Sequence, residues 1–104
     1  MQELNIEALR NICRGDNIKW TLHALKRLRK RKISSEAVVN AVLAGEIIEQ
    51  YPNDKPFPSC LIFNKDYKNP LHVVISTDDK SVYLITEYHP TLSEWESDYK
   101  TRKE

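Results

Sequence analysis

The sequence predicts an α+β fold in a single domain of residues 1–104, with N-terminal helices packed on a mainly antiparallel four-stranded sheet. Two observations support this prediction. Apolar residues follow a helical period as far as Gly45, and segments rich in Val, Ile, Leu and Tyr come after it. Both glycines stand where predicted helices end, and prolines separate the later segments. Because the helices precede the strands, they are expected to cover one face of the sheet.

Three helices are expected before Gly45. The first occupies residues 3–14, where Leu and Ile recur at helical spacing. The second follows Trp20 and contains most of the basic residues of this half. The third has a stripe of Ala and Val, with Glu36 in a first turn that favours negative charge. The expected caps are Thr21 and Ser34 or Ser35 at the N-termini, and Gly15 and Gly45 at the C-termini.

Four strands are expected after the helices, and the last two are the clearest because they are rich in β-branched and aromatic residues. A loop with three prolines covers residues 52–58, and a hairpin turn covers residues 77–80. A short helix is expected after Pro90, followed by a frayed end at residues 100–104. The expected strands are residues 46–51, 59–63, 71–76 and 81–88.

The stretch from Trp20 to Ser34, read as a helix, separates apolar from basic residues. Ala24, Leu25 and Leu28 fall on one side. The other side carries His23, Lys26, Arg27 and Lys30, with Arg31 at the border. Between positions 14 and 32 the chain has eight Lys or Arg and one acid, a net charge of +7, so the remainder sums to −6. This polarity favours an anionic partner, with a phosphodiester as the first candidate, although a solvated basic face has the same composition.

Composition excludes several classes of protein. No apolar run approaches the roughly 20 residues that cross a bilayer, and the acidic N-terminus is unlike a secretory signal. Cys13 and Cys60 fit two buried thiols in a reducing compartment. Together with His72 and His89 they lack compact ligand spacing, and there is no glycine-rich phosphate loop. We therefore expect a cytoplasmic protein without a membrane partner, a metal or a cofactor.

Two histidines and an arginine predict the chemistry. Cleavage of RNA without a metal needs a base for the 2′-hydroxyl proton, an acid for the leaving oxygen and a cation near the phosphate. His23, His72 and Arg27 have the side chains for these roles, since imidazole titrates near neutrality. Tyr88 can assist proton transfer, and Thr86 can bind a phosphate or ribose. The alternative for His72 is a hydrogen-bonded structural histidine in an apolar strand.

The register of the last hairpin decides whether these groups share a face. Side chains alternate across a strand, so Thr86 and Tyr88 lie on one face. A two-residue hairpin loop would put His72 on the opposite face of the sheet. A loop with an odd number of residues would put His72 on the same face as Thr86 and Tyr88. The sequence leaves both registers open. Trp20 and Trp95 are expected to pack rather than to stack on bases.

Several short motifs also resemble a family of small bacterial proteins, over about four-fifths of the chain. Their order and spacing carry the resemblance. The matching residues are Trp20-Thr-x-His23-Ala-x-x-Arg27-Leu-x-x-Arg31-x-Ile33-Ser34, Gly45-Glu-Ile-Ile-Glu49, Tyr51-Pro52, Pro58-Ser-Cys-Leu61, Pro70-Leu-His72-Val-Val, Ile85-Thr86-x-Tyr88-x-Pro90 and Trp95.

That family is a domain of unknown function. Many of its members resemble toxins encoded beside a zinc-finger antitoxin of the MqsA type, and it is similar to the RelE and MqsR messenger-RNA interferases of the barnase-like fold. The resemblance implies a metal-independent endoribonuclease that acts as the toxin of a type II toxin–antitoxin system, with RNA and an antitoxin protein as partners. It implies a catalytic set of His23, Arg27, His72 and Tyr88, and substrate binding by Lys26, Lys30, Arg31 and Thr86.

Two positions depart from the family's pattern. Asn69 stands where an arginine often precedes the Pro-Leu-His motif, which removes one expected phosphate contact. Lys32 stands where a glycine usually follows the second helix arginine, which predicts a less sharp helix end. Two other functions fit the same residues: a non-catalytic RNA-binding module that uses the basic helix, and a protein-interaction module whose histidines are structural.

Overall fold

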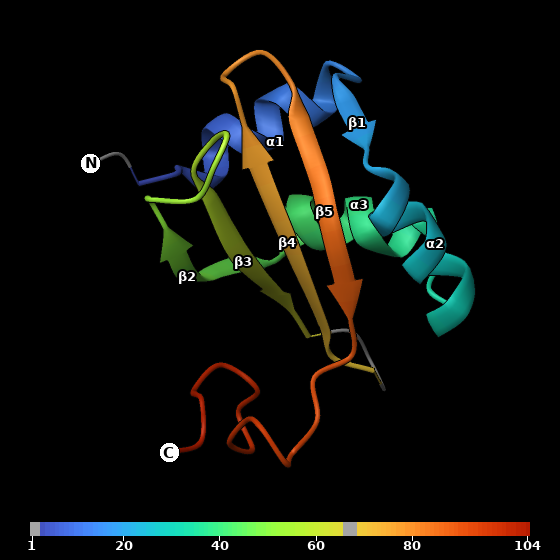
Figure 1. Cartoon of the computed structure of the whole chain (residues 1–104), viewed down its shortest axis with the longest axis vertical. Helices are drawn as coiled ribbons and strands as arrows, with labels where there is room; N and C mark the ends of the chain where they lie inside the picture. The colour runs from blue at the N-terminus through green and yellow to red at the C-terminus, as the bar shows by residue number, and fades with distance from the viewer. Residues whose placement is uncertain (1–2, 66–68) are drawn as a thin grey trace.

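The computed structural model describes residues 3–65 and 69–104, which form three helices and a five-stranded sheet. The helices precede all but one of the strands, as the α+β prediction requires (Figure 1). The elements are α1 (Ile6–Arg14), β1 (Ile18–Trp20), α2 (Leu22–Arg31), α3 (Ser35–Ala44), β2 (Glu46–Tyr51), β3 (Ser59–Asn64), β4 (Leu71–Thr77) and β5 (Val82–Tyr88).

The predicted helix caps are confirmed. The Thr21 hydroxyl accepts a hydrogen bond from the Ala24 N–H at 3.1 Å, and the Ser34 hydroxyl does the same for Ala37 at 3.1 Å. Thr21 also donates its hydroxyl proton to the Leu84 carbonyl at 2.9 Å, so the residue that starts α2 attaches it to β5. Gly15 and Gly45 stand just past the ends of α1 and α3.

The sheet is mixed and has the order β1-β5-β4-β3-β2. The prediction of four mainly antiparallel strands is therefore wrong by one strand, because β1 pairs with β5 in parallel, from Ile18 opposite Val82 to Trp20 opposite Leu84. A strand of three residues is too short to show an alternating pattern, and the adjoining helix pattern conceals it. The other three pairings are antiparallel, as predicted.

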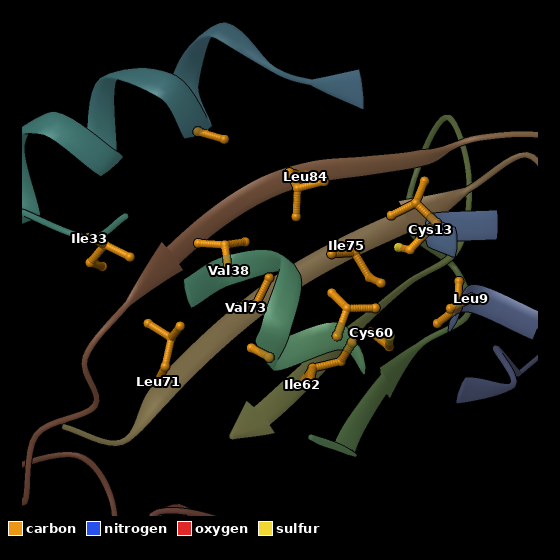
Figure 2. Packing of buried hydrophobic residues seen from close by; sticks show 14 residues of the cluster. Leu9, Cys13, Ile33, Val38, Cys60, Ile62, Leu71, Val73, Ile75 and Leu84 are labelled. Atoms are coloured by element: carbon orange, nitrogen blue, oxygen red, sulfur yellow. The ribbon is translucent and has the colours of Figure 1, made fainter. Parts of the chain in front are cut away.

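The core lies between the sheet and the helices. Figure 2 shows Val38 of α3 and Leu9 and Cys13 of α1 directed toward Ile62, Val73 and other strand residues. Helix α2 lies beside β5 and contributes Ala24, which is fully buried (Figure 1). Cys13 and Cys60 are free and buried, as expected.

A β-bulge settles the register that the sequence left open. Ile75 pairs with Leu84, but Val74 pairs with Thr86, so Ile85 is an extra residue in β5. The loop between the paired residues Thr77 and Val82 has an even number of residues, 78–81. The extra residue in the bulge shifts the register by one, as a loop with an odd number of residues would have done. His72 therefore pairs with Tyr88, on the face that also carries Thr86.

Leu25 lies on the apolar side of α2 with Ala24 and Leu28 but is 48% exposed, whereas Ala24 is buried and Leu28 packs against the core. One local prediction is wrong: residues 92–94 form a turn where a short helix was expected after Pro90. Trp95 is 2% exposed and forms an isolated bridge with Arg102, so side-chain packing fixes the backbone there.

Within the described ranges, none of the helices is both long enough and apolar enough to cross a membrane.

Candidate functional site

A polar hollow of about 620 Å³ lies where β5 ends and the chain turns into the C-terminal segment, residues 89–104. In Figure 1 this segment lies beyond the end of β5, below the sheet. Two arginines, from α2 and from the C-terminal segment, face a tyrosine at the end of β5. The lining residues are Arg31, Tyr88, His89, Glu94, Trp95 and Arg102.

His72 lies behind the wall of this hollow and contacts Tyr88. Its Nε2 is 2.7 Å from the Tyr99 carbonyl oxygen, and its Nδ1 is 3.3 Å from the Tyr88 hydroxyl. A carbonyl only accepts, so Nε2 carries the proton and Nδ1 accepts from Tyr88. Burial lowers the pKa of His72, and the neutral ring fits this tautomer.

The imidazole of His72 has no exposed surface, since three aromatic rings enclose it. The ring centroids of Phe63, Tyr88 and Trp95 lie 5.8, 5.3 and 4.5 Å from that of His72, each in an edge-on arrangement. Tyr88, which is half-buried, and Trp95 both line the hollow and separate His72 from it. Of these two residues, Tyr88 has its hydroxyl next to His72 Nδ1.

Arg31 comes from the last turn of α2, and β5 holds it in place. Its Nη1 donates to the Glu87 carbonyl at 2.7 Å, and its guanidinium lies 5.9 Å from the centre of the Tyr88 ring. Across residues 3–65 and 69–104 its guanidinium forms no ion pair within 4.0 Å. Arg31 is thus a cation at the hollow with a fixed position and an uncompensated charge.

Arg102 faces the hollow from the other side, but its charge is paired. Its Nε and Nη2 bind the two carboxylate oxygens of Glu49 at 2.8 and 3.0 Å, and its guanidinium stacks on Trp95 at 4.6 Å. Burial raises the pKa of Glu49, but the hydrogen bonds from Arg102 and Tyr51 outweigh it and hold that pKa below its ordinary value. Glu49 therefore stays ionised, and Arg102 anchors the C-terminal segment to β2.

The sequence assigned no role to His89, and the structure places it in the lining of the hollow. Its Nδ1 donates to the Pro70 carbonyl at 2.9 Å, which leaves Nε2 as the other nitrogen of the ring. Across the described ranges no three His, Cys, Asp or Glu side chains come close enough to hold a metal ion. The position of His89 next to Tyr88 at the end of a strand is the signal that could have identified it.

Of the predicted site residues, Arg31 and Tyr88 line the hollow, and His72 contacts it through Tyr88. Thr86 is half-buried on the same face of β5 but outside the hollow's lining. The other predicted residues lie on α2: exposed His23, half-buried Arg27, and Lys26 and Lys30 in a separate groove. The structure therefore brings Tyr88 and Arg31 together at the hollow, with His72 next to Tyr88, and leaves Thr86 and the other predicted helix residues outside it.

Glu87, which the sequence did not single out, is fully buried on the opposite face, where it pairs with Val73. Neither carboxylate oxygen has a hydrogen-bond partner among the described residues. Burial raises the pKa of Glu87 to about 7, although nearby Arg31 lowers it. Glu87 therefore has a side-chain carboxyl with a pKa near neutrality, and its own backbone carbonyl accepts the hydrogen bond from Arg31.

Comparison with known proteins gives one match. Residues 20–89 match the family model described as Domain of unknown function (DUF4258). No curated protein and no solved structure matches the chain. The matched segment runs from the last residue of β1 to His89, so it includes His72, Tyr88 and Arg31 and leaves out Arg102. Because the match covers more than half of the chain, this protein belongs to the DUF4258 family, whose function is uncharacterised.

Proposed function

We propose that this protein is a metal-independent endoribonuclease that cleaves RNA in the hollow around Tyr88. The proposal depends on one observation above all: two adjacent proton-transfer groups, Tyr88 and His89, share a polar hollow with the uncompensated cation of Arg31. Cleavage by the 2′-hydroxyl requires two proton transfers and a cation at the phosphate, and the hollow contains these groups.

His89 is the general base in this scheme. Its Nδ1 proton is committed to the Pro70 carbonyl, so Nε2 is the ring nitrogen left to take the proton of the 2′-hydroxyl. As Nε2 takes that proton, the 2′-oxygen attacks phosphorus and the bond from phosphorus to the 5′-oxygen breaks. The products are a 2′,3′-cyclic phosphate and a free 5′-hydroxyl.

Tyr88 supplies the proton for the leaving 5′-oxygen. Burial raises the pKa of Tyr88, so its hydroxyl is protonated at neutral pH. The contact to His72 Nδ1 is long, at 3.3 Å, so it holds the hydroxyl only weakly. After proton donation, the imidazolium of His89 returns a proton to the tyrosinate through water. His72, which the sequence predicted as an acid or base, is in this scheme a positioning residue.

Arg31 stabilises the charge that grows on the phosphate oxygens. Its hydrogen bond to the Glu87 carbonyl fixes the guanidinium before substrate binds, as electrostatic catalysis requires. The remaining cations of α2, including Lys26 and Lys30, attract the RNA backbone from a distance, with His23 and Arg27 on the same helix.

We also propose that the protein acts in the cytoplasm as the toxin of a type II toxin–antitoxin system, with messenger RNA as substrate and a cognate antitoxin protein as inhibitor. The support is the resemblance to RelE and MqsR toxins and a single small domain whose chemistry requires only its own side chains. Growth arrest on expression, relieved by Tyr88→Phe, is the expected outcome in cells.

The nuclease proposal is tested with purified protein and a fluorescent RNA oligonucleotide in the presence of EDTA. Tyr88→Phe, His89→Gln and Arg31→Met are each expected to slow cleavage at least about 100-fold. Tyr83→Phe is the matched control, because Tyr83 lies on β5 but donates to Asp78 at 2.8 Å, away from the hollow. A substrate with deoxyribose at the cleaved position should resist cleavage. Absence of cleavage by the wild-type protein, or equal loss in the Tyr83 variant, would contradict the proposal.

A non-catalytic RNA-binding module is the second candidate, and the complete burial of His72 favours it. This function predicts salt-sensitive binding of RNA without cleavage. It also predicts that Arg31→Met weakens binding while Tyr88→Phe leaves it unchanged. The same variants thus separate the two functions.

A further inference from the structure

The outer face of α2 exposes two leucines that lie outside the hydrophobic core formed by the described residues. Leu22 is 68% and Leu25 48% exposed, and they are three residues apart on one side of the helix. Another large apolar side chain with comparable exposure, Leu92, lies on the C-terminal segment at 50%. Neighbouring exposed leucines on a surface helix indicate a contact surface rather than a core position.

A groove of about 370 Å³ runs beside these leucines, and we call it the α2 groove. Its lining residues are Leu22, Leu25, Lys26, Arg29 and Lys30. It shares no lining residue with the hollow around Tyr88. The α2 groove thus combines an apolar floor with three cations, and the helix that forms it has no acidic residue.

We propose that the α2 groove binds an acidic amphipathic segment of a partner protein, most simply a helix with apolar residues every three or four positions. Its apolar face would cover Leu22 and Leu25, and its carboxylates would meet Lys26, Arg29 and Lys30. This inference goes beyond the nuclease proposal, and the leucines take no part in that proposal.

Charge and apolarity together select this occupant. A second copy of the chain would bring the same cations against one another across a two-fold axis, which opposes association. RNA would match the cations, but phosphate and ribose leave leucine side chains without an apolar partner. An acidic segment with its own apolar residues satisfies both kinds of lining.

The leucines rather than the cations are expected to carry most of the affinity. Removing a fully covered leucine from an interface weakens binding by roughly tenfold or more, whereas a charge at the rim changes mainly the association rate and its salt dependence. The double substitution Leu22→Ser with Leu25→Ser should therefore weaken binding at least about 30-fold. Reversing the charge of both Lys26 and Lys30 should weaken it less and reduce its salt dependence.

The experiment selects a displayed library of 16-residue helical peptides, randomised at every position, on the full-length protein. The enriched peptides are expected to carry Asp or Glu together with apolar residues spaced three or four apart. Their affinities for the wild-type protein, the Leu22/Leu25 double variant and the matched control Leu92→Ser are measured by fluorescence anisotropy. Circular dichroism checks that α2 remains folded.

Support requires acidic amphipathic peptides that lose at least 30-fold affinity for the double variant and none for Leu92→Ser. Enriched peptides without acids, equal binding to the double variant, or no enrichment would overturn the proposal. So would a dimer in sedimentation that the double variant dissociates, since a second copy would then occupy the groove. An equally large loss of single-stranded RNA affinity in the double variant would assign the groove to RNA instead. Cleavage assays with the same variants keep this result separate from the nuclease proposal, because the leucine substitutions should leave the cleavage rate unchanged.

Discussion

His72 and Glu87 are two ionisable side chains without exposed surface, and they lie on opposite faces of the same pair of strands. Both ring nitrogens of His72 have a hydrogen-bond partner, whereas within the described residues neither carboxylate oxygen of Glu87 has one. Burial shifts both pKa values toward the neutral form. The difference shows that burial alone does not define a functional group: the histidine stabilises its surroundings, whereas the carboxyl weakens the fold wherever it is charged.

The largest expected effect is the loss of His72. Replacing it with alanine removes two hydrogen bonds, leaves the Tyr99 carbonyl without its donor and opens a cavity between three aromatic rings. We expect His72→Ala to lower the free energy of unfolding by about 3–4 kcal/mol, measured by urea denaturation. His89→Ala, at an exposed imidazole, should cost less than about 1 kcal/mol. Equal losses in both variants would show that His72 does not stabilise this end of the sheet.

Replacing Glu87 with glutamine should raise the free energy of unfolding, and the increase should depend on pH. The pKa of Glu87 is raised to about 7 in the folded protein, so the folded state binds more protons than the unfolded state between about pH 4.5 and 7. The stability of the wild-type protein therefore falls as pH rises through that window and stays low above it. Glu87→Gln should be more stable than wild type by about 2–3 kcal/mol at pH 8 and nearly equal at pH 4.5.

The measurement is the free energy of unfolding between pH 4.5 and 8, with Glu96→Gln as the control at an exposed carboxyl. Parallel pH profiles for wild type and Glu87→Gln would mean that Glu87 does not titrate in this range.

Arg31 interacts with groups on both faces of β5, since its guanidinium lies over Tyr88 and its charge lowers the pKa of Glu87. Arg31→Met should raise the pKa of Glu87 further and cost about 1 kcal/mol of stability through the lost bond to the Glu87 carbonyl. Carbon-13 NMR of the Glu87 carboxyl measures the titration directly. Lys30→Met, one position earlier on the outer side of α2, should leave that titration in place; equal shifts in both variants would argue against direct coupling.

The smallest expected effect is at Lys32, which ends α2 with a left-handed backbone at φ 55°. That conformation strains a residue with a Cβ, so Lys32→Gly should stabilise the fold by about 0.5–1 kcal/mol without altering the titration of either buried group. Lys30→Gly, inside the helix, should cost about 1 kcal/mol. Thermal unfolding of the two variants compares them; destabilisation by Lys32→Gly would contradict the expected strain.

Local features of this protein were predictable from its sequence, and features that depend on distant contacts were not. Thr21 and Ser34 cap helices because a hydroxyl binds an amide two or three residues away, so the pattern is visible in a short window. The strand β1 was missed because its pairing with β5 joins residues far apart in the sequence. The exposure of Leu25 could not be predicted, because a helical wheel does not show which edge of the apolar stripe meets the sheet.

In the candidate site, too, the local features could be predicted and those that depend on distant contacts could not. Arg31, His72 and Tyr88 belong to the motifs that carried the family resemblance, and they do meet at one end of β5. The packing of Trp95 on His72 could not be predicted from the sequence, because the C-terminal segment has no regular period and is held by the ion pair of Arg102 with Glu49. The sequence offered a structural His72 only as an alternative, and it did not identify the aromatic side chains that enclose it.

The β-bulge at Ile85 has a consequence for how this gene can vary. Because β5 holds one residue more than its ladder with β4 needs, a one-codon deletion of Ile85 would still leave Thr86, Glu87 and Tyr88 opposite Val74, Val73 and His72. A homologue that lacks the residue at position 85 would keep the same pocket. In a homologue that lost a residue from β4 instead, the residues of β4 opposite Tyr88 and Glu87 would shift by one position, so their side chains would change faces of the sheet.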